Sequence, residues 1–263
     1  MKAVLPSIFA NRILLAAGLL AVALFQAVPG YAQQPAKAPT EDEWHRQEED
    51  RLHNDWAFLK RYAAANQQLP APQPGTPRVV LLGNSITEGW PTADSAFFAR
   101  RKPYEYIGRG IGGQTSGQML LRFRQDVVAL RPAVVVILAG TNDVAENRGP
   151  YQPQATMDNI MSMAELARAQ GIRVVLCSVP PVYDFPWHPK LQPAPKIVAL
   201  NQLIKAYAAK NSLVYLNYHT TLADERQGLK KEYGQDGVHP TLPGYRVMEP
   251  LLEQAVATAL KHK

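Results

Sequence analysis

Five short apolar runs alternate with longer helical stretches after residue 77, and this alternation constrains the fold more than any other feature. The runs are RVVLL (78–82), YEYIG (104–108), AVVVILAG (133–140), RVVLCSV (173–179) and LVYL (213–216). Continuous apolar strands separated by helices are typical of a parallel sheet that is covered on both faces. We therefore predict an α/β fold, a three-layer α/β/α sandwich with a five-stranded parallel sheet.

The helical stretches between and after these strands are predicted near residues 116–130, 154–170, 195–210 and 243–261. A further charged amphipathic helix is predicted at the N-terminal side of the domain, over residues 41–69. Thr40 followed by Glu43 has the spacing of a capping box, which would start that helix. The segment PAPQPGTP (70–77) then separates it from the first strand.

The first 32 residues have the layout of a secretory signal peptide. Lys2 and Arg12 precede an apolar block at 13–25, and Gly30 and Ala32 supply the small residues of a cleavage site after Ala32. That block is too short to span a bilayer core of about 30 Å, so we expect no stable membrane anchor. We predict a cleaved signal peptide (1–32), a leader (33–40) and a single domain (41–263), secreted or periplasmic in a bacterial cell.

Composition excludes several functional classes. The chain has 263 residues, of which 46% are hydrophobic, enough for the core of one α/β domain. Its net charge of +6 comes from scattered basic residues, so no nucleic-acid partner is expected. The single cysteine, Cys177, excludes an intrachain disulfide and lies in an apolar run, which indicates a buried core residue. No cluster of Cys and His suggests a metal site, and no cofactor is expected.

The first candidate site follows the first predicted strand, where the apolar run ends in Gly83-Asn84-Ser85. The carboxyl ends of parallel strands are where α/β proteins place their sites. A serine at a strand-to-helix turn can expose its hydroxyl and place its own N–H at a helix start, where negative charge is favoured. The alternative is an ordinary helix-capping serine, which is common.

A second candidate is the sequence DGVHP (236–240). Asp236 and His239, three residues apart in a Gly/Pro-rich loop, can pair through one ring nitrogen and leave the other nitrogen as a general base. The alternative is a surface turn with an incidental histidine. Of the six histidines, His45, His53 and His262 lie in polar helical stretches and are expected to be solvated. Among the three in loops, only His239 has an acid at a spacing that suits such orientation.

Two more strand ends carry polar or glycine-rich sequences. GRGIGGQTSG places Gly108, Gly110 and Gly113 in dinucleotide-like spacing, so a nucleotide-binding module is a rival interpretation. Against it, the expected acid about 20 residues further on is missing. The same glycines can instead supply a backbone N–H to an anion. In AGTNDV, the Asn142 amide can donate to an oxyanion or can form an Asx turn.

Taken in order, Gly-Asn-Ser, Gly-Gly-Gln-Thr, Gly-Thr-Asn-Asp and Asp-x-x-His-Pro resemble the four sequence blocks of the SGNH (GDSL-type) hydrolases. The resemblance covers most of the chain after residue 78 and implies a flavodoxin-like five-stranded fold. It implies Ser85 as nucleophile, Asp236 and His239 as its triad partners, and an oxyanion hole formed by Ser85, Gly113 and Asn142. The Gly-x-Ser-x-Gly signature of α/β-hydrolases is absent from the sequence.

The chain departs from the usual pattern of that family at Asn84, Gly108 and Gln114, which affects the hydrogen bonds expected to hold the loops. It is also similar to secreted bacterial members placed near carbohydrate acetylesterases. The resemblance thus implies a serine esterase that acts on short-chain (acetyl) esters of carbohydrates, a small-molecule or glycan substrate. A lysophospholipase, thioesterase or arylesterase of the same family is the alternative, and a silent glycan-binding relative is the non-hydrolase alternative.

Four residues are candidates for substrate contact. Asn84 and Trp90 flank the serine in sequence, and Tyr183 and Trp187 lie in the aromatic loop PVYDFPWHPKLQP, together with Phe185. Aromatic rings in such a loop can stack on a sugar or can pack within the loop itself.

Overall fold

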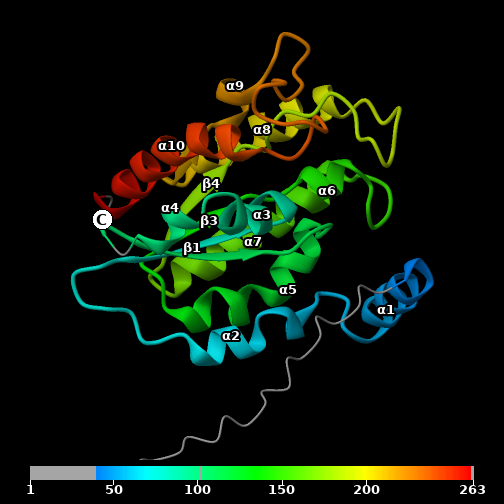
Figure 1. Cartoon of the computed structure of the whole chain (residues 1–263). Coiled ribbons are helices and arrows are strands. Elements are labelled where there is room, and N and C mark those ends of the chain that lie inside the picture. Colours follow the sequence, from blue (N-terminus) through cyan, green and yellow to red (C-terminus); the bar gives the residue numbers. More distant parts are fainter. Residues whose placement is uncertain (1–39, 101, 262–263) are drawn as a thin grey trace, which may run out of the picture.

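The computed structural model describes residues 40–100 and 102–261, so the predicted signal peptide and residues 33–39 of the predicted leader lie outside the described residues. Its sheet has the strand order β2-β1-β3-β4-β5, and every neighbouring pair is parallel (Figure 1). The strands are β1 (Arg78–Gly83), β2 (Glu105–Gly110), β3 (Val134–Ile137), β4 (Arg173–Cys177) and β5 (Val214–Leu216). This confirms the predicted five-stranded parallel sheet.

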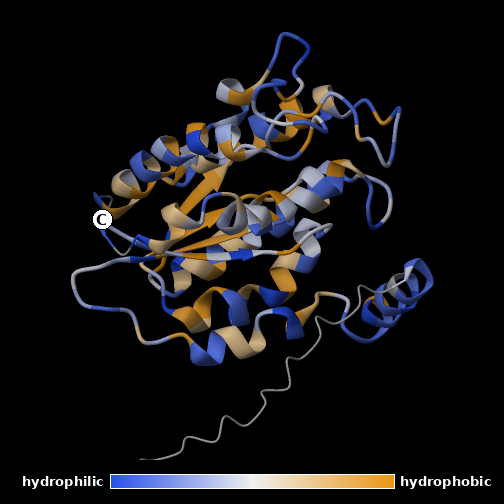
Figure 2. Ribbon diagram, viewed as in Figure 1, coloured by the Kyte–Doolittle hydropathy of each residue, from blue (hydrophilic) through white to orange (hydrophobic). Residues whose placement is uncertain are grey.

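Helices cover both faces of the sheet, as the continuous apolar strands predict (Figures 1 and 2). Along β1, Val80 and Leu82 pack in the core under α5, α7 and α8, whereas Val79 and Leu81 pack in the core under α3, α4 and α10. This alternation follows from the two-residue period of a strand. The helices are α3 (Ser85–Ala93), α4 (Ser95–Ala99), α5 (Ser116–Asp126), α6 (Thr141–Val144), α7 (Pro153–Ala169), α8 (Pro193–Lys210), α9 (Tyr218–Leu222) and α10 (Leu242–Lys261).

The four helices predicted between and after the strands are present within a few residues of their expected bounds. The stretch predicted at 116–130 is divided, because α5 ends at Asp126 and a 3₁₀ turn, η2 (Val128–Leu130), follows it. Cys177 is buried in the core, and burial raises the pKa of its thiol.

The single N-terminal helix predicted over 41–69 is wrong. The segment forms α1 (Glu41–Asn54), a 3₁₀ turn η1 (Leu59–Arg61) and α2 (Ala63–Gln68). The Thr40–Glu43 capping box is present, but the helix stops at Asp55, whose carboxylate accepts hydrogen bonds from the backbone N–H groups of Leu59 and Lys60. Such local bonds from an aspartate compete with helix continuation. We call residues 55–68, which follow this break and run beside α5, the N-terminal arm (Figure 1).

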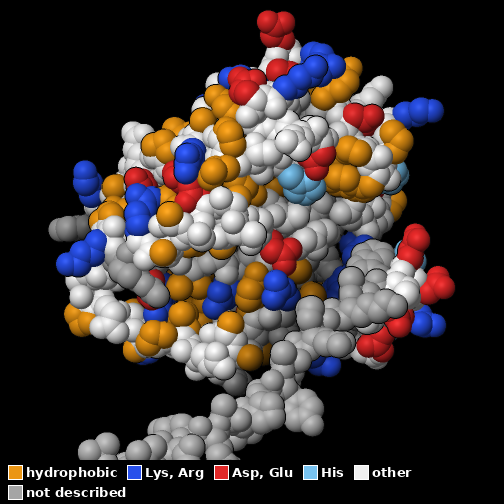
Figure 3. All heavy atoms as spheres, in the orientation of Figure 1, with side chains coloured by type: hydrophobic (Ala, Val, Ile, Leu, Met, Phe, Trp, Pro, Cys, Tyr) orange, Lys and Arg blue, Asp and Glu red, His pale blue; other side chains and the backbone are white. Residues whose placement is uncertain are grey.

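Charged side chains of both signs are interspersed over the face of the molecule drawn in Figure 3. Among the residues that the structure describes, no helix combines the length and the apolar character needed to cross a bilayer.

Candidate active site

Ser85 is the first residue of α3 and follows β1 after a single intervening residue, Asn84. The Asn84 side chain accepts a hydrogen bond from the backbone N–H of Ile86 at 3.0 Å and so caps the helix. Because Ser85 opens the helix, its own backbone N–H has no intrahelical acceptor. The strand-to-helix turn therefore holds a half-buried hydroxyl beside a donor group at the positive end of α3.

His239 brings the distant loop before α10 against this turn. Its Nε2 lies 2.9 Å from Ser85 Oγ, and its Nδ1 lies 2.6 Å from Asp236 Oδ2. The three predicted triad residues therefore form one continuous hydrogen-bonded series. With Nδ1–H donating to the carboxylate, Nε2 is the acceptor for the serine proton.

The carboxylate of Asp236 is fixed by its own loop. Its Oδ1 accepts hydrogen bonds from the backbone N–H groups of Val238, at 2.9 Å, and His239, at 2.8 Å. Burial raises the pKa of Asp236, but the bonds from the His239 backbone and ring and from Val238 outweigh it, so its pKa lies below the ordinary value. Asp236 is thus ionised at neutral pH and favours one orientation of the imidazole.

The residues expected to form an oxyanion hole are Ser85 at the start of α3, Gly113 in the loop between β2 and α5, and Asn142 in α6. Asn142, near the start of α6, is buried, and its Nδ2 donates to the backbone carbonyl of Gln114 at 2.9 Å. Asn147 donates to the Asn142 Oδ1 at 3.0 Å, which assigns the amide its orientation. Gly113 has a φ of +72°, a backbone conformation that favours glycine. A primary amide has two N–H groups, so Asn142 retains a second donor.

Gly112 connects that loop to the nucleophile turn. A Cβ on Gly112 would lie 3.8 Å from the Ser85 Cβ and 3.1 Å from the Glu88 carboxylate. The Gly112 backbone N–H donates to that carboxylate at 2.7 Å. The loop between β2 and α5 therefore lies directly against the candidate nucleophile.

Gly110 gives a structural reason for the glycine spacing that had suggested a nucleotide site. A Cβ there would lie 2.1 Å from the Glu88 nitrogen and 2.6 Å from the Asn84 carbonyl oxygen. The absence of a side chain therefore lets the end of β2 pack against the start of α3, which accounts for this glycine without a phosphate.

Trp187 lies beside the triad, and its side chain is 47% exposed. Its ring centroid is 6.1 Å from that of His239, and its Nε1 donates to Asn147 Oδ1 at 3.1 Å. Tyr183 is also exposed, but it lies under the Arg226 guanidinium and lines a cavity of about 310 Å³ on the side of Asp236 and Gly237. Both remain candidates for substrate contact.

The other two residues proposed for substrate contact, Trp90 and Asn84, are buried, which contradicts that expectation, and Phe185 of the aromatic loop is buried as well. Trp90 is 3% exposed and stacks between Phe97 and Tyr245 in the core. Asn84 is fully buried as the cap of α3. Phe185 is also fully buried and packs against the Trp187 ring, so it supports the loop instead of facing a ligand.

Sequence reasoning missed Glu88 and Asn147 as members of the site. Glu88 lies three residues after Ser85, a spacing that keeps two side chains on one side of a helix, so the helix period was a usable signal. Asn147 lies in the irregular segment after α6, where no periodicity indicates the direction of a side chain.

An α/β/α fold that carries a hydrogen-bonded serine, histidine and aspartate at the carboxyl edge of a parallel sheet is the arrangement of a hydrolase. Residues 81–247 match the family model of GDSL-like lipases and acylhydrolases. The chain belongs to this GDSL-like lipase/acylhydrolase family, which confirms the resemblance drawn from the four sequence blocks.

Relatives of known structure or sequence agree with this membership. A GDSL-like lipase from Bacteroides thetaiotaomicron is 50% identical, with a TM-score of 0.75, over 78% of this chain and 100% of that chain. Esterase TesA of Pseudomonas aeruginosa is 29% identical over 188 residues, 68% of this chain and 82% of that protein. The uncharacterized lipoprotein YqeF of Bacillus subtilis is 33% identical over 40% of this chain and 49% of that protein.

Proposed function

We propose that the protein is a serine esterase that hydrolyses carboxylic esters through an acyl-enzyme. The observation that carries this proposal is the hydrogen-bonded series from Ser85 Oγ through His239 to Asp236. As Oγ attacks the ester carbonyl, His239 Nε2 accepts the serine proton, and Asp236 stabilises the imidazolium that forms.

The reaction has two halves, the acylation of Ser85 and the hydrolysis of the acyl-enzyme. The tetrahedral intermediate collapses as the C–O bond to the alcohol breaks, and His239 returns the proton to the departing alkoxide. Water next gives a proton to His239 and attacks the acyl carbonyl. The bond between the acyl carbon and Oγ then breaks and His239 returns the proton to Oγ, which releases the acid and restores the Ser85 hydroxyl. In both steps the oxyanion is held by the backbone N–H groups of Ser85 and Gly113 and by the second N–H of Asn142.

The substrate class is proposed to be short-chain, above all acetyl, esters of carbohydrates. Polar groups belong to the segments at the nucleophile, since the Glu88 carboxylate lies against the Gly112 position next to Ser85, and Asn142 and Asn147 bond to one another. A long acyl chain needs a continuous apolar surface, whereas an acetyl group does not. The exposed Trp187 ring beside His239 offers a face for a sugar ring.

A fluorophosphonate probe tests the nucleophile. We expect the probe to label the protein once, on Ser85, as mapped by peptide mass spectrometry, and the Ser85→Ala protein to remain unlabelled. Labelling at another serine, or none in protein that is folded by circular dichroism, would refute the proposed mechanism. A rise in melting temperature with a nucleotide, without esterase activity, would instead support a nucleotide-binding module.

Acyl-chain profiling tests the substrate class. We expect kcat/KM for p-nitrophenyl acetate to exceed that for the octanoate by about tenfold or more, since an acyl pocket discriminates by a few kcal/mol. We also expect acetate release from acetylated xylan. A preference for long chains would support the lysophospholipase or thioesterase alternative.

We further propose that the protein is exported, with cleavage after Ala32. The support is the order of basic, apolar and small residues in the first 32 positions. N-terminal sequencing of protein recovered from the periplasm or medium of an expressing bacterium should begin at Gln33. Recovery of the uncleaved chain in the cytosol alone would contradict export.

A further inference from the structure

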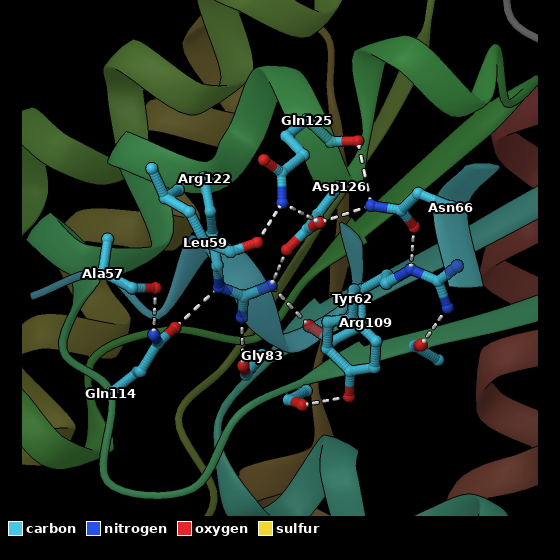
Figure 4. Close-up of polar contacts among 12 residues, drawn as sticks. Ala57, Leu59, Tyr62, Asn66, Gly83, Arg109, Gln114, Arg122, Gln125 and Asp126 are labelled. Atoms are coloured by element: carbon cyan, nitrogen blue, oxygen red, sulfur yellow. Dashed lines mark hydrogen bonds and ion pairs between the residues drawn. The ribbon is translucent and has the colours of Figure 1, made fainter. Parts of the chain in front are cut away.

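Arg122 is a fully buried arginine on α5 whose hydrogen bonds join three elements of the site. Its guanidinium donates to the carbonyl of Gly83 at the end of β1, at 2.9 Å, and to that of Arg109 in β2, also at 2.9 Å. It also donates to Gln114 Oε1 at 2.6 Å and to Asp126 Oδ2 at 3.1 Å (Figure 4). A buried guanidinium is tolerated only when its donors are satisfied, so these contacts are held together as one unit.

Gln114 links this unit to the predicted oxyanion hole. Its side chain is fixed at both ends, because Oε1 accepts from Arg122 and Nε2 donates to the Ala57 carbonyl at 2.7 Å (Figure 4). Its backbone carbonyl accepts from Asn142 Nδ2 at 2.9 Å. A glutamine that cannot move its side chain thus fixes the carbonyl that orients the Asn142 amide.

The N-terminal arm holds the same loop at a second point. We call residues 110–114 the oxyanion loop. Tyr62 of the arm donates its hydroxyl hydrogen to the Gly110 carbonyl at 2.5 Å, at the start of this loop (Figure 4). Together with the bond from Gln114 to Ala57, it anchors both ends of the oxyanion loop on the arm.

A third contact reaches the middle of the oxyanion loop through Glu88. Arg61 of the arm pairs with the Glu88 carboxylate at 3.1 Å, and that carboxylate accepts from the Gly112 backbone N–H at 2.7 Å. This pair is partly exposed, so we treat it as the weakest of the three anchors.

We propose that Gln114 is a positioning residue that couples the N-terminal arm to the oxyanion hole, so that the arm is needed for turnover. This rests on the proposed esterase function. An acid, the usual residue of the family at this position, would still accept from Arg122. It would have no N–H for the Ala57 carbonyl, so at this position an amide joins the arm to the loop and an acid does not.

Gln118 provides a matched control. Its Nε2 donates to the carbonyl of Trp56, one residue before Ala57, at 2.7 Å, while its Oε1 accepts from the Thr115 N–H and caps α5. Gln114→Glu and Gln118→Glu each remove one amide donor to the arm and keep the acceptor. Only the Gln114 bond ends on the oxyanion loop.

The test measures kcat and KM for p-nitrophenyl acetate hydrolysis by each full-length variant, together with the melting temperature of that variant. We expect Gln114→Glu to lower kcat by roughly 10- to 100-fold, with KM within about twofold, because small displacements of catalytic groups cost that much. We expect Gln118→Glu to keep kcat within about threefold even if its melting temperature falls equally. Equal kcat values for Gln114→Glu and the unmodified protein, or equal losses in both variants, would overturn the proposal.

Tyr62→Phe provides a second test that does not depend on the folding of the Gln114 variant. It keeps the ring, which lies under the Arg109 guanidinium, and removes only the hydroxyl bonded to the Gly110 carbonyl. We expect a lower kcat with an unchanged KM, and unchanged kcat would contradict coupling through the arm. An unmodified protein without turnover would refute the esterase function and this proposal together, whereas active protein with unaffected variants refutes the positioning role alone.

Discussion

Ser85 Oγ and His239 Nε2 lie 2.9 Å apart although 154 positions separate them in the sequence. The serine is placed by the end of the central strand β1, and the histidine by the loop that precedes α10. Because α10 packs on the sheet face that also carries α3, the two loops meet at the carboxyl edge of the sheet. The fold thus brings together groups that neither segment could hold alone.

Ser85→Ala and His239→Ala should each lower kcat by about 10⁶-fold, and the double variant should lose no more than either alone. The physical reason is that proton acceptance by the imidazole is useful only when the serine hydroxyl is present. The measurement is kcat for p-nitrophenyl acetate in the single and double variants, with Ser95→Ala, an exposed serine at the start of α4, as the control. Additive losses would mean that the two residues act independently.

Asn142→Ala should lower kcat by roughly two to three powers of ten, because one oxyanion donor is lost. Asn147→Ala removes the bond that orients the Asn142 amide and the acceptor of the Trp187 Nε1–H, but it removes no oxyanion donor, so it should give a smaller loss. Steady-state kinetics of the two variants test this ranking. A loss below about tenfold for Asn142→Ala would argue against its role in the oxyanion hole.

The sheet and the triad could be predicted because both depend on patterns that the sequence carries directly. Apolar runs of strand length fix the order of elements, and the polar residues that end them are brought to one edge by parallel topology. Ser85 ends such a run, whereas His239 lies in the loop before α10 and was indicated by its spacing from Asp236. Their pairing followed from the resemblance of the four sequence blocks to those of the SGNH hydrolases.

The predictions that the structure corrects concern the direction of side chains on a helix and the residue at which a helix ends. A helix turns about 100° per residue, so Glu88 stays near the direction of Ser85, whereas Trp90 is turned by about 140° into the core. The break at Asp55 arises from its carboxylate bonding to Leu59 and Lys60, together with the left-handed backbone of Phe58. The direction of Glu88 and of Trp90 follows from the helix period once the start of α3 is known, whereas a periodic apolar pattern does not record the break at Asp55.

Trp187→Ala should raise KM for an acetylated xylo-oligosaccharide by roughly threefold to tenfold, in proportion to the loss of one aromatic face. The effect on p-nitrophenyl acetate should be smaller, because that substrate has no sugar ring. Trp56→Ala is the matched control, since Trp56 is similarly exposed, at 41%, but belongs to the N-terminal arm. Equal changes for the two substrates would indicate that Trp187 supports His239 instead of binding the sugar.

Trp90→Ala should destabilise the fold by about 3–5 kcal/mol, the usual cost of removing a buried large aromatic side chain. The ring stacks between Phe97 and Tyr245, with centroid distances of 5.9 Å and 5.1 Å. Denaturant unfolding gives the free energy, and steady-state kinetics below the transition should give a KM close to that of the unmodified protein. A large rise in KM at unchanged stability would restore Trp90 as a substrate-binding residue.

Asp236 should stabilise the folded state through its charge, in a way that depends on pH. Burial raises its pKa, but the hydrogen bonds from His239 and Val238 lower it further, so the folded-state pKa lies below the ordinary value of about 3.9. A depressed folded-state pKa contributes stability that is present above the unfolded pKa and lost as pH falls through the folded pKa.

The neutral amide of Asp236→Asn keeps the acceptor for the two backbone N–H groups but has no charge to lose. The free energy of unfolding of the unmodified protein, minus that of Asp236→Asn, should therefore be larger at neutral pH than below about pH 3. Denaturant titrations of both proteins at the two pH values measure this difference, and an equal difference at both would show that the Asp236 charge adds nothing to the loop that holds the catalytic imidazole.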